Sequence, residues 1–153
     1  MTLTREELKK TYLKIQVYRG FIIGKSIDIE SMINAILNLY FAKKSRQNEF
    51  MHKALDDEYF SFGLKIRILE KINLNLEKEL IKKIRRINNI RNEFAHKVPG
   101  IIPKSDTISI SFDITKKDPK KIEDLHRNFV TLVKETEQEL NKIFDQLVNE
   151  NNK

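Results

Sequence analysis

The residues whose types and spacing suggest chemistry lie near the middle of the chain, in the segment Arg91-Asn92-Glu93-Phe94-Ala95-His96. An arginine keeps its charge in any protein environment and presents planar donors that match phosphate oxygens or a carboxylate. A histidine titrates near neutral pH and can act as a general acid or base. Arg91 and His96 together therefore hold the minimum set for metal-independent cleavage of an RNA phosphodiester. The histidine would handle the protons, and the arginine would stabilise the charged phosphorane.

The spacing on a helix decides which of these side chains can work together. Residues five apart on an α-helix point about 140° away from each other, so Arg91 and His96 do not stack. Asn92 and His96 are four apart and share a face, where the amide can hold the imidazole in one orientation. We therefore expect Arg91 to bind the scissile phosphate, His96 to transfer protons and Asn92 to orient the histidine.

The apolar pattern of the helix that carries the motif predicts an unusual position for Arg91. Apolar residues recur around it at alternating spacings of four and three, and Arg91 fills one position of this stripe. A buried guanidinium costs several kcal/mol of desolvation unless a carboxylate, a phosphate or water receives it. Glu30 is likewise a charge in an apolar stripe, so we expect it to contact Arg91, within one chain or across a dimer. The apolar stripe around Arg91 consists of Leu80, Ile84, Ile87, Phe94 and Val98.

The charge balance favours a polyanionic partner. The chain has 29 Lys and Arg against 22 Asp and Glu, which gives a net charge of +7 and favours nucleic acid as a partner. A basic run on the motif helix could follow a phosphate backbone towards the motif, and the alternative interpretation is a solvated helix face. The candidate nucleic-acid-binding residues are Lys82, Lys83, Arg85, Arg86 and Lys97.

The composition argues against several other classes of protein. The absence of cysteine excludes a disulfide framework and a thiolate site, and no His-Glu-x-x-His motif or carboxylate cluster supports a metal site. The four glycines form no loop that could cradle a phosphate, so we expect no cofactor. The apolar run 21–42 carries charges and amides at depths that a bilayer disfavours, and the first residues do not resemble a signal peptide. We expect a cytoplasmic protein without a membrane partner.

Helical periodicity and cap signals predict an all-α fold in a single domain over residues 1–153. Ser61 is expected to cap one helix, and the apolar alternation in 107–114 predicts a strand that pairs with 100–103. The fold expected is an antiparallel four- to five-helix bundle with a small β-hairpin or strand insertion before the last helix. Residues 44–60 are expected to form a loop or a short mobile helix. The helices are expected at about 5–19, 21–43, 61–72, 77–97 and 118–150.

The sequence makes further predictions about the first three helices. Gly20 and Gly24 are expected to loosen the junction between the first and second helices. The second helix has two adjacent apolar stripes, so we expect it to be covered on more than one side. The third helix is expected to face the core with Leu64, Ile68, Leu69 and Ile72.

The segment from Ile84 to His96 resembles the signature helix of the HEPN superfamily, whose motif is an arginine, a polar residue, three further positions and a histidine. The order of an N-terminal helix, a long apolar helix with a glutamate and a Leu-Glu-Lys helix is similar to the HEPN-like group that includes mannitol operon repressor proteins. The resemblance implies a homodimer in which two motifs meet in one cleft. It also implies a metal-independent endoribonuclease of toxin-antitoxin or phage-defence systems, with RNA as substrate and an antitoxin or regulatory protein as partner. By this resemblance Arg91, Asn92 and His96 are the catalytic set, supported by Glu30.

Two other interpretations stay open. In the first, the chain is a non-catalytic HEPN-like regulator, or a module that binds nucleic acid or protein, resembling mannitol operon repressor proteins. In the second, the motif is structural: Arg91 bridges to a buried carboxylate and His96 caps helix carbonyls. The exposure of His96 separates these cases from catalysis, because a catalytic histidine must be reachable by its substrate.

Overall fold

Three long helices make up most of the structure. The computed structural model describes residues 5–72, 74, 76–96, 100–104, 107–111 and 119–152. The long helices are α1 (Arg5–Phe41), α4 (Lys78–His96) and α5 (Pro119–Asn151), and the shorter α3 spans Phe62–Lys71. The bounds of α3, α4 and α5 confirm the predicted helices at 61–72, 77–97 and 118–150 to within two residues.

The remaining elements are short. Between α1 and α3 the chain forms a single 3-10 turn, η1 (Lys44–Arg46), followed by α2 (Gln47–Phe50) and one π turn, η2 (Met51–Leu55). Before α5, strand β1 (Gly100–Lys104) pairs antiparallel with β2 (Thr107–Ser111), with Gly100 opposite Ser111. Residues 112–114 of the expected strand lie outside the described part of the chain.

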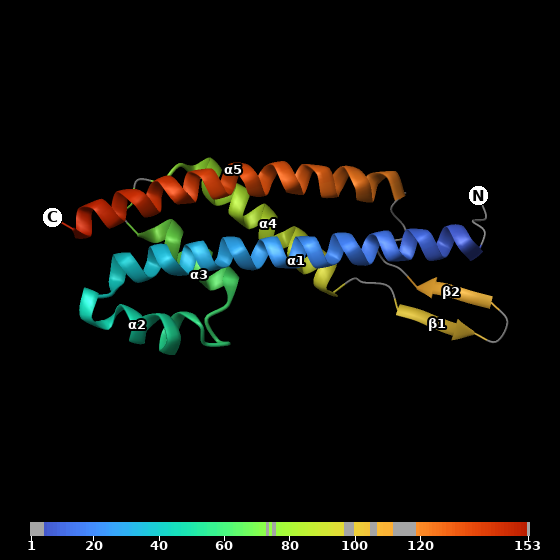
Figure 1. The fold of residues 1–153 in the computed structure, drawn as a ribbon, viewed down its shortest axis with the longest axis horizontal. Coiled ribbons are helices and arrows are strands. Elements are labelled where there is room, and N and C mark those ends of the chain that lie inside the picture. Colours follow the sequence, from blue (N-terminus) through green and yellow to red (C-terminus); the bar gives the residue numbers. More distant parts are fainter. Residues whose placement is uncertain are drawn as a thin grey trace.

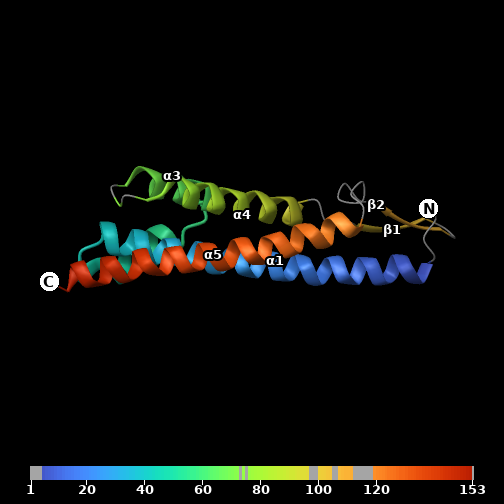
Figure 2. The same ribbon diagram turned by 90° about the horizontal axis from the view of Figure 1, so that it is seen from above.

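The long helices lie side by side in two layers. Figure 1 shows α1 and α5 running in the same direction with α4 crossing them in the opposite one, and Figure 2 shows α3 and α4 as a layer stacked on the α1–α5 pair. Lys25 Nζ meets Glu137 Oε1 at 3.4 Å, and Asn151 Nδ2 donates to the Leu39 carbonyl at 3.3 Å, which fixes α1 and α5 as parallel neighbours. The prediction of a helical bundle is confirmed, but the antiparallel arrangement is wrong for this pair. Because α1, α4 and α5 alternate in direction, the first and the last become parallel when they pack together.

The glycines near the middle of α1 do not interrupt it. We predicted separate helices at 5–19 and 21–43, whereas the structure has one helix of 37 residues that continues through Gly20 and Gly24. A glycine weakens a helix by roughly 1 kcal/mol relative to alanine. Ile15 and Ile22 are nevertheless both buried, one on each side of Gly20. Packing on both sides of the glycines therefore outweighs their low helix propensity.

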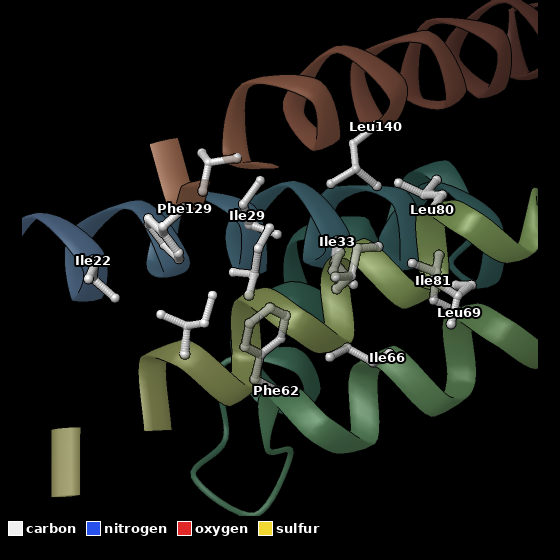
Figure 3. Packing of buried hydrophobic residues seen from close by; sticks show 14 of the residues in the cluster. Ile22, Ile29, Ile33, Phe62, Ile66, Leu69, Leu80, Ile81, Phe129 and Leu140 are labelled. Carbon is white, nitrogen blue, oxygen red and sulfur yellow. The ribbon is translucent and has the colours of Figure 1, made fainter. Parts of the chain in front are cut away.

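The core lies where the two layers meet. Figure 3 shows Ile29 and Ile33 of α1 in one cluster with Leu80 of α4 and with Phe129 and Leu140 of α5. All five side chains are buried, and each contributes roughly 1.5–3 kcal/mol of hydrophobic stabilisation. This core fixes the rotation of α4 and so decides which side chains of the motif face outwards.

The orientation of α3 agrees with the prediction in part. Ser61 caps the helix as expected, because its Oγ accepts a hydrogen bond from the Leu64 amide at 3.3 Å. Leu69 is buried and Ile68 and Ile72 pack against the core, as predicted, whereas Leu64 is exposed and the neighbouring Lys65 is buried. The other buried side chains of α3 are Phe62, Ile66 and Leu69. A short helix with apolar residues at two overlapping spacings does not reveal which side faces the core.

No helix within the described ranges is both long and apolar enough to cross a bilayer.

Candidate functional site

The motif occupies the last two turns of α4. Ile90 and Phe94 are buried and hold this end of the helix against the core. Arg91 is half-buried, and Asn92 and His96 are exposed. The prediction that Arg91 takes a buried position of the apolar stripe is therefore corrected, because Ile90 is the buried residue of that turn. The guanidinium lies at the edge of the core, where solvent or a ligand can reach it.

Arg91 is held by an aromatic ring. Its Cζ lies 5.9 Å from the centroid of the Phe62 ring, and Phe62 is the buried first residue of α3. A guanidinium at this distance from a ring is attracted by about 0.5–2 kcal/mol and keeps its donors free for other partners. Among the side chains that the structure describes, no carboxylate forms an ion pair with Arg91. The charge is therefore positioned but not neutralised.

The predicted contact between Glu30 and Arg91 is wrong within the chain. Glu30 Oε1 instead accepts a hydrogen bond from Lys65 Nζ at 2.7 Å. The Lys65 side chain is only 4% exposed and that of Glu30 20% exposed, so this pair joins α1 to α3 at the edge of the core. The rotation of α3 explains the difference, because it brings a lysine rather than an apolar side chain to α1. A contact across a dimer stays a prediction.

A second arginine reaches the motif and was not identified from the sequence. Arg19 Nη2 of α1 donates to the carbonyl of Ala95 at 3.4 Å. The carbonyls in the last turn of a helix have no partner within the helix, so Arg19 caps this end of α4. The same signal that singled out Glu30 could have found it, since Arg19 is a charge in the apolar stripe between Ile15 and Ile22. No comparable signal links Phe62 to Arg91.

Asn92 and His96 are both exposed but do not contact each other. In the described part of the chain no hydrogen bond joins the Asn92 amide to the His96 imidazole, so the expected orienting role of Asn92 is not present in this arrangement. His96 is exposed to solvent, so its own chain does not seal it from a substrate. The end of α4 thus combines an available guanidinium with an accessible imidazole, which can bind an anion and transfer protons.

The basic run earlier in α4 is mostly engaged in ion pairs. Lys82 Nζ meets Glu79 at 2.5 Å, and Arg85 Nη2 meets Glu70 of α3, also at 2.5 Å. Arg86 is exposed, and no ion pair of Arg86 occurs among the residues with described side chains. Lys97 lies outside the described residues. At least two of the predicted nucleic-acid-binding residues therefore serve contacts within the chain.

Lys83 is the most strongly paired of these residues. Its Nζ lies 2.8 Å from Glu139 and 2.9 Å from Glu135, both on α5. The hydrogen bonds to the two carboxylates raise the pKa of Lys83 well above its usual value. Lys83 therefore connects α4 to α5 and would have to leave two carboxylates to contact a phosphate.

His126 of α5 packs against aromatic rings of α1. The ring of His126 stacks on Tyr18 with 4.1 Å between centroids and 19° between planes, and Phe21 lies 5.2 Å away. Burial lowers the pKa of His126 below its usual value, because the protonated ring would lose hydration. This histidine stabilises the pair of parallel helices in its neutral form.

The described residues contain no group of three or more histidine, cysteine, aspartate or glutamate side chains placed to hold a metal ion. No protein-family model matches the sequence, and no curated protein or solved structure matches it either. The resemblance to the HEPN superfamily therefore rests on the motif helix and on the order of the helices around it.

Proposed function

We propose that the chain is a cytoplasmic, metal-independent endoribonuclease of the HEPN type, acting in a toxin-antitoxin or phage-defence system. Arg91 and His96 carry the chemistry, and Asn92 orients the histidine once substrate is bound. The observation that supports this proposal best is the position of Arg91, which lies over Phe62 without a carboxylate partner among the described side chains, five residues before the exposed His96. A structural arginine would be neutralised by a carboxylate, whereas a phosphate-binding arginine needs its donors free.

The reaction follows from these two groups. The neutral imidazole of His96 takes the proton of a ribose 2′-hydroxyl, and the resulting oxygen attacks the adjacent phosphorus. The bond from phosphorus to the 5′-oxygen breaks, which leaves a 2′,3′-cyclic phosphate, and the 5′-oxygen takes a proton from water or from His96 of a second copy. Arg91 donates to the non-bridging oxygens, where negative charge develops in the transition state. No metal takes part in any of these steps.

The proposal includes a homodimer, and an exposed stripe on α1 supports it. Leu13, Val17 and Ile27 are at least half exposed, and open space surrounds Gly20 and Gly24 between them. The alternating spacing of four and three is that of a helix-pairing seam, and glycines allow two backbones to approach closely. An antiparallel pairing of the stripe with itself places Gly20 opposite Gly24 about a twofold axis. A second copy of the chain therefore fits this surface.

Light scattering tests the dimer. Val17→Glu should convert the protein to a monomer, because it places a charge within the apolar seam, at its most exposed apolar residue. Tyr59→Glu is the matched control, since Tyr59 is an exposed apolar residue away from the stripe. A monomeric wild-type protein, or a dimer that survives Val17→Glu, would contradict this interface.

The enzymatic proposal is tested by RNA cleavage in EDTA. We expect the wild-type protein to leave 2′,3′-cyclic phosphate ends and His96→Ala to be slower by about 10²–10⁴-fold. His52→Ala is the control, because His52 is an exposed histidine outside the motif, paired with Asp56. Equal cleavage by His96→Ala would reveal a contaminating nuclease.

The alternative is a non-catalytic HEPN-like regulator or binding module resembling mannitol operon repressor proteins. The missing hydrogen bond between Asn92 and His96 favours it, since an imidazole that nothing orients is a weak general base. In this case Arg91 still binds a phosphate or an acidic partner, such as an antitoxin or regulatory protein. Absence of cleavage with any RNA, together with Arg91-dependent binding, would support this alternative.

A further inference from the structure

The end of α1 forms a cleft that the motif does not use. The chain turns back there through η1, α2 and η2, and Figure 1 shows α2 folded alongside the C-terminal end of α1. The cleft has a volume of about 710 Å³. Its walls combine two aromatic rings with three cations, which are Phe41, Phe50, Lys43, Arg46 and Lys53.

The two aromatic rings differ in exposure. Phe50 is half-buried and packs against the core, so it has a structural role. Phe41 is 52% exposed although it is the last residue of a long, well-packed helix, and its ring meets the edge of Tyr40 with 4.9 Å between centroids. An exposed aromatic ring on a cleft wall provides a flat apolar surface on which a nucleic-acid base can stack.

The cations of the cleft also differ in their partners. Lys53 Nζ binds Glu49 at 3.1 Å, the one acidic residue of the lining. Lys43 and Arg46 are exposed, and neither forms an ion pair among the described side chains. They follow Phe41 by two and five residues and line the same cleft, so free positive charge and an exposed aromatic surface occur together.

We propose that this cleft binds one nucleotide of a single-stranded RNA, with the base on Phe41 and the phosphate between Lys43 and Arg46. The choice of RNA rests on the proposed function. Phe41 follows Arg19, the residue that touches the motif, by 22 residues of one helix. This separation corresponds to roughly 33 Å along α1. A strand long enough to span it can occupy both sites, whereas a mononucleotide can occupy only one.

Fluorescence anisotropy with a labelled 20-nucleotide single-stranded RNA tests the cleft, in a His96→Ala background that prevents cleavage. Phe41→Leu keeps apolar bulk but loses the aromatic face, and we expect binding to weaken roughly 10-fold. Phe41→Tyr should restore it. Tyr59→Leu is the matched control, because Tyr59 is an exposed aromatic residue outside the cleft. Circular dichroism confirms that each variant is folded.

The salt dependence of RNA binding tests the two cations, Lys43 and Arg46, independently of base stacking on Phe41. Replacing Lys43 and Arg46 by glutamine should lower the slope of log affinity against log salt by about 0.7 for each lost phosphate contact. A duplex RNA of the same length should bind without dependence on Phe41, since its bases are not free to stack. Adenosine monophosphate should compete poorly with the 20-nucleotide strand, because it lacks the second contact.

The results separate the cleft from the catalytic proposal. Three results would contradict RNA binding in the cleft. They are unchanged RNA affinity in Phe41→Leu, an equal loss of affinity in Tyr59→Leu, and no RNA binding by the protein at all. If cleavage depends on His96 while Phe41→Leu binds normally, the enzyme stands and the cleft fails. If binding depends on Phe41 while the wild-type protein cleaves no RNA, the cleft stands and the enzyme fails.

Discussion

The two halves of α4 use their positive charges differently. In the first half, Lys83 and Arg85 meet carboxylates of α5 and α3 and hold the layers of the bundle together. In the second half, Arg91 lies over the ring of Phe62 and forms no ion pair with any side chain that the structure describes. A paired cation must give up its carboxylate before it can bind a phosphate, whereas a guanidinium on an aromatic ring keeps its donors free. The paired residues Lys82, Lys83 and Arg85 therefore have structural roles, and Arg91 on its aromatic ring marks the candidate site.

The largest expected effect tests this contrast by cleavage. Arg91→Ala should reduce the rate of RNA cleavage by about 10²–10³-fold, as expected for loss of a donor to the transition state. Arg85→Ala should change it by less than about 2-fold, because Arg85 serves Glu70. Rates are measured with saturating RNA in EDTA. Equal losses in the two variants would mean that the two halves of α4 act alike.

The next effect concerns stability and compares a buried ion pair with an exposed one. Glu30→Ala leaves Lys65, which is 4% exposed, without its partner, and we expect a loss of roughly 3 kcal/mol in the free energy of unfolding. Glu79→Ala, which breaks the exposed pair with Lys82, should cost less than about 0.5 kcal/mol. Urea unfolding measures both. A similar loss in the two variants would show that Lys65 finds another partner or reaches water.

A smaller effect tests whether the aromatic ring positions Arg91. Phe62→Leu retains an apolar side chain under the guanidinium but removes the aromatic face, so cleavage should fall by about 5-fold. Phe62→Tyr should retain most of the activity. Cleavage that is equal in both variants, with equal stability by urea unfolding, would show that packing alone holds Arg91.

The smallest effect comes from His126, away from both halves of α4. Its pKa is lowered in the folded state, so the unfolded chain binds the proton more readily. The stabilisation from the neutral ring is complete above the unfolded pKa of about 6.5 and decreases as the pH falls below it. His126→Phe should remove this part of the pH dependence between pH 7 and pH 5 in urea titrations. An unchanged pH profile would mean that His126 is not responsible.

Some features of the fold could be predicted because local signals define them. Ser61 is a cap, and Pro119 is suited to the first turn of a helix, so the starts of α3 and α5 follow from single residues. Long-range packing gives no such signal. Nothing in the sequence shows that α1 and α5 lie next to each other in parallel, or that packing carries α1 through Gly20 and Gly24.

The candidate site was predicted in part for the same reason. The position of the motif at the end of one helix follows from local signals, but the surroundings of Arg91 depend on how α3 is rotated. Because of that rotation, Arg91 contacts Phe62 instead of Glu30, and Glu30 pairs with Lys65. The second apolar stripe of α1 was expected to be covered, yet Ile27 is half exposed, because no other described helix covers that side of α1.

The most direct test is to locate a bound phosphate on α4. NMR spectra of ¹⁵N-labelled protein titrated with uridine 3′-monophosphate report which residues it contacts. We predict shifts of the Arg91 side-chain Nε–Hε signal and of the His96 ring, both lost in Arg91→Ala and kept in Arg85→Ala. Shifts confined to the residues from Lys82 to Arg86, or the same shifts in Arg91→Ala, would contradict the assignment of the phosphate site to the end of α4.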